Sequence, residues 1–382
     1  MLNHNESRTL PVNIDYSVFK NDEKAIFELR SLYQKYGYSQ FKMSKFEEYD
    51  LYVRNKDFLV SDNVITFTDT NGKLMALKPD VTLSIIKNSE DVKNSVQKLY
   101  YNENVYRVSK GTLSFKEIMQ VGLECIGDVD DYCIYEVLML AAESLKNISE
   151  DYVLDISQLD IVSSLIDELN VSGSAKAEIV KCIGEKNIHG INKICEEAGA
   201  DCEKLKKLVL AYGDLETVMP VLNEIKTEET KDAVNQLVKV VSALENSGYK
   251  GKIRIDFSVI NDMNYYNGFV FKGFIYGIAS GILSGGQYIK LMKKMGRKSG
   301  AIGFAVYLDM LERLSETEKK YDVDTVILYD ENSDLTALND AINMLTANGN
   351  SVLAEKTVPE KINYKQLLKL QERGVEIIEN NA

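Results

Sequence analysis

The chain has 382 residues, a formal net charge of −13 and a hydrophobic share of 45%. This length exceeds what one small core needs, so we expect two or three compact units. An acidic surface repels phosphate backbones, which argues against nonspecific nucleic-acid binding.

The few cysteines and histidines limit the chemistry available to the chain. The five cysteines include no CxxC pair, a pattern typical of reduced thiols in the cytoplasm. Two histidines, His4 and His189, are too few for a histidine-based zinc site or catalytic pair, so we expect no metal site. The first twenty residues show no secretion signal, and no apolar stretch reaches the length of a membrane span. We therefore expect a cytoplasmic protein.

The first 160 residues mix helical and strand patterns. The expected helices lie at 21–36, 81–87 and 131–144, and the expected strands at 63–67, 73–77, 98–108, 118–126 and 152–156. Asn71-Gly72 predicts a tight hairpin turn, because this pair suits the positive φ angles of a type I′ turn. The polar loop after residue 108 predicts a long antiparallel hairpin between the strands at 98–108 and 118–126.

The composition changes at about residue 161. From there to about 248 the sequence is rich in Lys and Glu and has few strand signals, which predicts a helical insertion. Later the expected strands lie at 253–257, 268–274 and 277–281, and the expected helices at 288–295 and 306–314. We expect α+β architecture, with an antiparallel sheet, flanking helices and the insertion within residues 1–320.

The tail, residues 321–382, has its own pattern. Strand-like VDTVILY, SVLAEK and VEIIE alternate with expected helices at 335–345 and 364–373. This order predicts a small βαβαβ domain with a parallel sheet.

Several separated segments carry a family resemblance in the correct order. They are LMALKPDVTLSIIKN (74–88), VYRVSKGTLSFKEIMQVGLECIG (105–127), NDMNYYNGFVFKGF (261–274) with SGGQYIKL (284–291), and GAIGFAVYLDML (300–311). Together they resemble histidyl-tRNA synthetases and their paralogue, the regulatory subunit of ATP phosphoribosyltransferase. The resemblance implies a class II aminoacyl-tRNA synthetase-like fold.

Departures from the synthetase pattern bear on activity. Asn261 and Met310 stand where an active synthetase has arginines, and Lys78 takes another arginine position. Adenylation develops negative charge on phosphate, and one fixed donor for such charge contributes about 3–4 kcal/mol to lowering the barrier. Neutral side chains supply no such charge, so the resemblance favours the regulatory paralogue, with no catalytic residues and no cofactor.

The same resemblance implies a histidine pocket. Its expected residues are Asp80, Thr82, Arg107, Gln120, Glu124, Tyr265, Tyr266 and Tyr288. In the family pattern the aspartate, threonine and glutamine face the α-amino group, and Arg107 faces the carboxylate. Glu124 and Tyr266 bracket the imidazole nitrogens, while the other two tyrosines line the wall. The implied partners are a short ATP phosphoribosyltransferase catalytic subunit and L-histidine as effector, with a homodimer inside a hetero-oligomer.

Plainer interpretations exist for most of these residues. Asp80 suits a helix start, and Gln120 with Glu124 suits a solvated strand face. Tyr265 and Tyr266 are adjacent and would point opposite ways on a strand, so one of them would belong to the core. Arg107 suits a surface ion pair. Gly285-Gly286 suits a bend.

Two further alternatives concern a surface and the function. Lys290, Lys293, Lys294, Arg297 and Lys298 form a local basic run, which suits either a solvated helix face or a docking surface toward the catalytic partner. The two alternatives to a regulatory subunit are a divergent active histidyl-tRNA synthetase and a stand-alone amino-acid-sensing paralogue.

Overall fold

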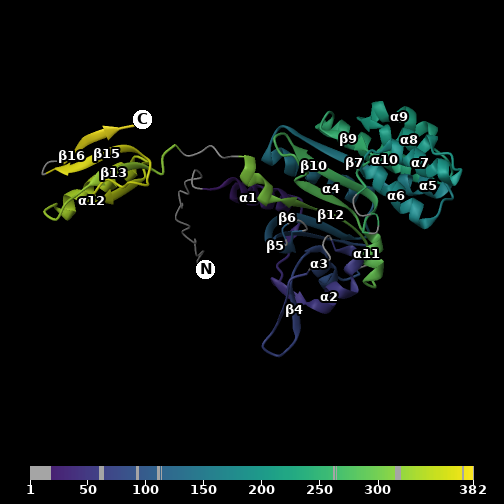
Figure 1. Cartoon of the computed structure of the whole chain (residues 1–382), viewed down its shortest axis with the longest axis horizontal. Coiled ribbons are helices and arrows are strands. Elements are labelled where there is room, and N and C mark those ends of the chain that lie inside the picture. Colours follow the sequence, from purple (N-terminus) through teal and green to yellow (C-terminus); the bar gives the residue numbers. More distant parts are fainter. Residues whose placement is uncertain are drawn as a thin grey trace, which may run out of the picture. The chain divides into compact units, whose positions relative to one another are not determined.

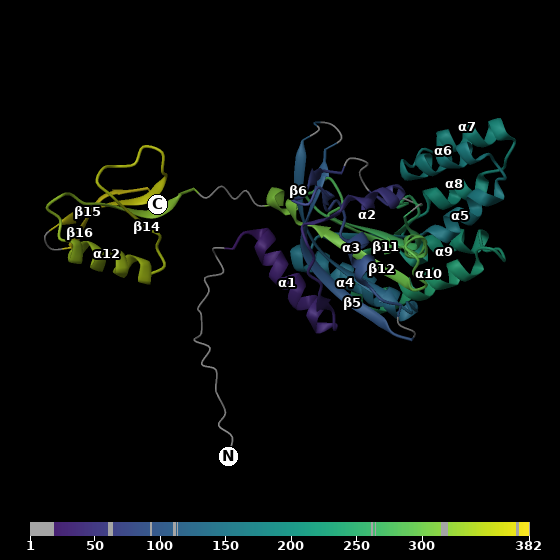
Figure 2. The same ribbon diagram turned by 90° about the horizontal axis from the view of Figure 1, so that it is seen from below.

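The computed structural model describes residues 19–59, 64–91, 94–109, 112, 114–260, 263, 265–314, 320–371 and 374–381. The chain divides into two compact units, Met1–Leu314 and Ser315–Ala382. Figures 1 and 2 show the elements of each. Within the described residues no helix is long and apolar enough to cross a membrane.

A nine-stranded sheet forms the centre of the first unit. In spatial order its strands are β1 (Ser39–Gln40), β5 (Val96–Val108), β6 (Phe115–Gly127), β12 (Gly300–Tyr307), β11 (Leu283–Gln287), β10 (Asn267–Ile275), β7 (Tyr152–Gln158), β9 (Ile253–Asp256) and β8 (Tyr212–Gly213). Neighbours from β5 to β7 are antiparallel, whereas β1 with β5 and β7 with β9 are parallel. The expected antiparallel sheet is confirmed.

The long hairpin of β5 and β6 is the feature that the sequence predicted best. Each strand has thirteen residues, and Glu103 pairs with Gln120 while Leu99 pairs with Glu124. Residues two apart on a strand share a face, so Gln120 and Glu124 point the same way. Both side chains are buried, so the solvated-face interpretation is wrong.

Helices cover one face of this sheet. α4 (Asp131–Ile148) begins at Asp130, whose carboxylate accepts a hydrogen bond from the Cys133 amide at 2.9 Å. Its apolar residues pack against β7, β10 and β12, and α1 (Asn21–Lys35) packs against α4. Figure 2 shows both helices beside the sheet. The opposite face of the sheet carries a small second sheet and several short helices.

The elements on this opposite face are a small antiparallel sheet and short helices. They are β2 (Phe46–Glu48), β4 (Leu74–Leu77), β3 (Thr66–Thr68), α2 (Tyr49–Arg54), a 3-10 turn (Lys56–Phe58) and α3 (Thr82–Asn88). The predicted hairpin between β3 and β4 exists, but its turn is not the expected type I′, because Gly72 has a positive φ and Asn71 does not. Its turn is stabilised by Asp69, whose carboxylate accepts from the Asn71 and Lys73 amides at 2.8 Å, and Gly72 has φ +80°.

Helices fill most of the segment between β7 and β9. They are α5 (Leu159–Glu168), α6 (Gly173–Gly184), α7 (Ile188–Ala198), α8 (Glu203–Leu210), α9 (Leu215–Glu224), α10 (Lys231–Leu244) and a π-helical turn (Glu245–Tyr249). The apolar faces of these helices belong to the main hydrophobic core, which α1, α4 and the nine-stranded sheet also form.

Two predictions near the sheet are wrong. The segment 277–281 is a turn, with Gly277 at φ +90°, and the strand runs instead through Gly285-Gly286 as β11. The predicted helix at 306–314 is the end of β12 followed by a 3-10 helix (Leu308–Leu314). Periodicity does not separate strand from helix in a short apolar run that is buried on both sides. The 3-10 helix and α11 (Ile289–Lys294) complete this unit.

The second unit is a four-stranded sheet with one helix. Its elements are β13 (Val323–Leu328), α12 (Leu335–Ala347), β14 (Val352–Glu355), β15 (Tyr364–Gln371) and β16 (Gly374–Asn380). The spatial order is β14-β13-β15-β16, with β15 parallel to β13 and antiparallel to β16. The predicted second helix at 364–373 is therefore wrong, and the order is βαβββ. Leu367, Leu368 and Leu370 are buried in a central strand, a spacing that a helix also tolerates.

Candidate functional site

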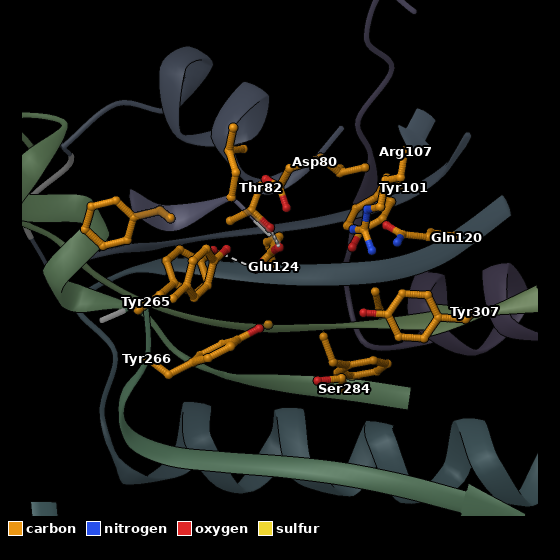
Figure 3. Close-up of a pocket in the computed structure, with 17 residues that line it drawn as sticks. Asp80, Thr82, Tyr101, Arg107, Gln120, Glu124, Tyr265, Tyr266, Ser284 and Tyr307 are labelled. Atoms are coloured by element: carbon orange, nitrogen blue, oxygen red, sulfur yellow. Dashed lines mark hydrogen bonds between the residues drawn. The ribbon is translucent and has the colours of Figure 1, made fainter. Parts of the chain in front are cut away.

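One pocket of about 470 Å³ gathers residues from almost every predicted motif. All eight residues expected around an amino acid line it, as Figure 3 shows for seven of them. α3 and the turn before it supply Asp80 and Thr82, while β5 and β6 supply Arg107, Gln120 and Glu124. The volume falls in the range of small-molecule sites.

Glu124 lies at the centre of the pocket. Its carboxylate accepts hydrogen bonds from the Thr82 hydroxyl at 2.9 Å and from the Tyr288 hydroxyl at 2.6 Å. Burial, with a smaller contribution from the nearby Asp80 carboxyl, raises the pKa of Glu124 to about 8, against the lowering effect of these two donors. This acid is therefore largely protonated at neutral pH and is able to share a proton with a basic ring.

Glycine on the neighbouring strand makes space for this acid. Gly303 of β12 pairs directly with Glu124, and a Cβ at Gly303 would stand 1.8 Å from Glu124 Oε2. Gly286 of β11 is tight for the same kind of reason, because a Cβ there would stand 2.7 Å from the Tyr266 ring. These glycines let side chains from other strands fill the pocket floor.

The other end of the pocket holds Arg107. Its Nε donates to the Pro79 carbonyl at 3.1 Å, which fixes the guanidinium beside the turn that leads into α3. In that turn the Asp80 carboxylate accepts from the Leu83 amide at 2.9 Å. Burial raises the pKa of Asp80, while the Leu83 amide and the Arg107 charge lower it. Asp80 thus both accepts a hydrogen bond from the first turn of α3 and lines the pocket.

Three tyrosines form the wall near Glu124. Tyr265 and Tyr266 both line the pocket, with ring centroids 4.5 Å apart, so the expectation that one belongs only to the core is wrong. They precede β10 and do not follow the alternation of a strand. The Tyr288 centroid is 5.9 Å from that of Tyr265. Burial raises the pKa of all three phenols well above the usual value, so they remain neutral hydrogen-bonding groups.

Sequence reasoning missed the other lining residues. They are Phe58, Leu59, Val81, Tyr101, Ser284, Gly303, Phe304, Ala305 and Tyr307. Tyr101 lies in a segment that was correctly predicted to be a strand, but the neighbouring Tyr100 is buried as well, so local alternation did not single it out. Tyr307 carried no usable signal, because its segment was predicted to be helical and no face was assigned to it.

The positions that depart from the synthetase pattern do not bring positive charge into the pocket. Lys78 is fully buried, and its Nζ lies 2.6 Å from Glu103 Oε2 outside the lining. Met310 packs against the main core, where its sulfur accepts from the Ser280 hydroxyl at 3.4 Å. Asn261 lies outside the described residues. Among the described residues that line the pocket, Arg107 is the lone cation.

The basic run near α11 is mostly tied to the chain itself. Lys290 donates to the Met263 carbonyl at 3.0 Å, and Lys294 pairs with Asp57 at 2.9 Å. Arg297 donates to the Ile86 and Lys87 carbonyls at 3.2 Å. These contacts hold α11 over α3 and the 3-10 turn, which favours a structural role for the run. Within the described residues no group of acidic, cysteine or histidine side chains is arranged to hold a metal.

Comparisons with known proteins agree with this fold. A family model described as Histidyl-tRNA synthetase matches residues 15–311. An ATP phosphoribosyltransferase regulatory subunit from Acetivibrio thermocellus is 27% identical over 322 residues, which cover 81% of this chain and 77% of that protein.

Solved structures give the same picture of the fold. An ATP phosphoribosyltransferase regulatory subunit/histidyl-tRNA synthetase from Bacillus halodurans has a TM-score of 0.74 at 22% identity, covering 91% of this chain and 93% of that one. An ATP phosphoribosyl transferase (HisG:HisZ) complex from Thermotoga maritima contains a chain with a TM-score of 0.61 at 19% identity, covering 75% and 97%. The expected class II synthetase-like fold is confirmed.

Proposed function

The chain belongs to the histidyl-tRNA synthetase family, and from this premise we propose that it is a non-catalytic regulatory subunit of ATP phosphoribosyltransferase. In this role it associates in the cytoplasm with a short catalytic subunit and confers histidine feedback on it. Its curated relatives carry the regulatory-subunit name, which supports the assignment.

The observation that carries this proposal is the charge of the pocket. A histidine zwitterion needs one cation for its carboxylate, an acid and neutral acceptors for its ammonium, and partners for two ring nitrogens. The lining supplies Arg107, Asp80 with Gln120, and Glu124 with the tyrosines. The wrong amino acid would leave the Glu124 acid buried without a ring partner, which costs affinity.

The same lining is poorly suited to a nucleotide triphosphate. Phosphoryl chemistry depends on placed cations that meet the charge of the transferring group. The described lining offers Arg107 alone, and the Lys78 ammonium is already neutralised by Glu103. The Met310 position contributes a thioether to the core. The pocket therefore keeps amino-acid recognition without nucleotide activation.

Reconstitution with a short ATP phosphoribosyltransferase catalytic chain tests this function. We expect the rate of phosphoribosyl-ATP formation to rise as this chain is added, to level off at a fixed ratio, and to fall when histidine is present. An Arg107→Ala chain should still activate the catalytic chain and lose the response to histidine. Failure of the two chains to associate would argue against the regulatory role.

A second assay separates this role from the synthetase alternative. The isolated chain should show no histidine-dependent exchange between ATP and pyrophosphate. Robust exchange, or charging of histidine tRNA, would establish a divergent synthetase instead.

A further inference from the structure

Tyr307 lines the pocket at the end that holds Arg107. It is the last residue of β12, where it pairs with Gln120 of β6. Figure 3 shows its ring projecting into the pocket from this end, with the hydroxyl directed inward and with Arg107 and Gln120 beside it. A phenol, a guanidinium and an amide therefore meet at one end of the cavity.

The residues before Tyr307 explain why its ring forms a boundary. Gly303 and Ala305 precede it at two-residue spacing, so the three residues share one face of β12 and all line the pocket. Gly303 and Ala305 add little bulk to this face, whereas Tyr307 adds a large ring. The alternation of the strand thus places this ring at the Arg107 end of the cavity.

The environment of Tyr307 makes it a hydrogen-bond donor. Burial raises the pKa of its phenol, and the charge of the adjacent Arg107 only partly offsets this rise. The hydroxyl is therefore protonated at neutral pH. A carboxylate that faces Arg107 is able to accept from the Tyr307 hydroxyl as well.

We propose that Tyr307 is a specificity-determining residue that restricts this pocket to amino acids with a free α-carboxylate. The proposal rests on the proposed function, because it takes the ligand carboxylate to lie at Arg107. A group that is joined to that carboxyl carbon and extends past Arg107 then meets the Tyr307 ring, which projects into the pocket at this end. Peptides and aminoacyl adenylates that begin with the same amino acid are then excluded by shape, beyond the shortage of cations.

Calorimetric titration with two zwitterionic ligands tests the proposal. L-histidine carries its carboxylate at the expected place, whereas L-histidyl-glycine keeps a carboxylate and places a peptide unit before it. We expect the parent chain to bind histidine at least about 100-fold more tightly than the dipeptide. In Tyr307→Ala this ratio should fall by at least about tenfold, because the space of the ring is opened.

Matched variants separate shape from hydrogen bonding and from folding. Tyr307→Phe keeps the ring and should keep the ratio, with a loss of about three- to tenfold in histidine affinity from the missing hydroxyl. Tyr307→Leu removes the far end of the ring while keeping apolar bulk in β12, and it should lower the ratio as the alanine variant does. Tyr276, whose side chain is 85% exposed outside this pocket, is the control, and Tyr276→Ala should behave as the parent.

Each outcome decides between the two proposals. A parent chain that binds histidine and the dipeptide equally, or folded alanine and leucine variants that keep the parent ratio, would overturn the role of Tyr307 alone. A folded parent chain that binds no histidine would overturn the proposed function, and the role of Tyr307 with it.

Discussion

The two ends of the pocket hold their charged groups in different ways. At one end the Glu124 carboxyl is buried and receives two hydroxyl donors from within the chain, Thr82 and Tyr288. At the other end Arg107 is fixed through its Nε to a backbone carbonyl beside the phenol of Tyr307. The acid already accepts two hydrogen bonds from the protein and keeps its own proton for a ligand, whereas the guanidinium is positioned to receive an anion. Under the proposed function, recognition of a carboxylate should therefore depend mainly on Arg107, and recognition of a ring should depend on the proton of Glu124.

Removal of the cation should have the largest effect on binding. In Arg107→Ala we expect the affinity for histidine to fall by about 30- to 1000-fold, because a buried charge pair with the ligand is lost. Isothermal titration calorimetry measures the change. The control is Arg54→Ala, since Arg54 forms an exposed pair with Asp50. A loss below about threefold would show that the carboxylate lies elsewhere.

Replacement of the acid by an amide should have a smaller effect. In Glu124→Gln we expect histidine affinity to fall by about 30-fold at pH 7, since an amide cannot share a proton with imidazole. The amide oxygen still accepts from one hydroxyl, which preserves the wall. A thermal-shift panel with asparagine, glutamine and histidine should also show a weaker preference for histidine. An unchanged preference would place the ring away from Glu124.

The pH dependence sharpens the same contrast. Glu124 has a raised pKa of about 8, and a free imidazole has a pKa of about 6.5. Between pH 6.5 and 8 the free Glu124 carboxyl is protonated and the free imidazole is neutral. The two separate partners together then hold one proton, which is the number that the complex needs. Above pH 8 binding has to take up a proton, and below 6.5 it has to release one. The affinity should therefore be highest between about pH 6.5 and 8 and fall by up to about tenfold per pH unit outside this window.

The Glu124→Gln variant provides the control for this profile, because the α-amino group of histidine also titrates at alkaline pH. The ratio of parent to variant affinity isolates the proton of Glu124, and it should decrease as the pH rises above 8. A constant ratio from pH 7 to 9 would contradict the assignment of that proton.

Removal of the buried lysine should have the smallest effect on binding. Lys78 is paired with Glu103 and lies outside the pocket lining. In Lys78→Met we expect unfolding free energy to fall by about 2 kcal/mol, since Glu103 loses its partner, while histidine affinity changes by less than about threefold. Urea unfolding and calorimetry measure the two quantities. A large loss of affinity with unchanged stability would place Lys78 in the binding machinery.

Local patterns predicted the parts of the fold in which chain reversal has a clear signal. The β5–β6 hairpin followed from two strand-like segments joined by a polar loop, and the hairpin at Asn71-Gly72 followed from its turn residues. The segment 364–373 did not follow, because β15 is buried between two strands and its leucines also fit a helix.

The residues of the pocket also divide into those that the sequence predicted and those that it did not. The eight expected residues came from motifs with a family order, and the fold brings them to one cavity; whether they bind histidine stays a prediction. Tyr307 was missed because residues 306–314 were predicted to form a helix, and strand pairing across β12 and β6 is not visible in a local pattern. The empty space required at Gly303 is equally a property of the neighbouring strand.

The most direct test of the central claim is a calorimetric titration of the chain with L-histidine, performed with and without saturating magnesium-ATP. The claim is that the pocket recognises an amino acid and lacks the charge to engage a nucleotide. We predict binding of one histidine per chain, with a dissociation constant that magnesium-ATP changes by less than about threefold. Absence of histidine binding, or binding that requires magnesium-ATP, would contradict the account.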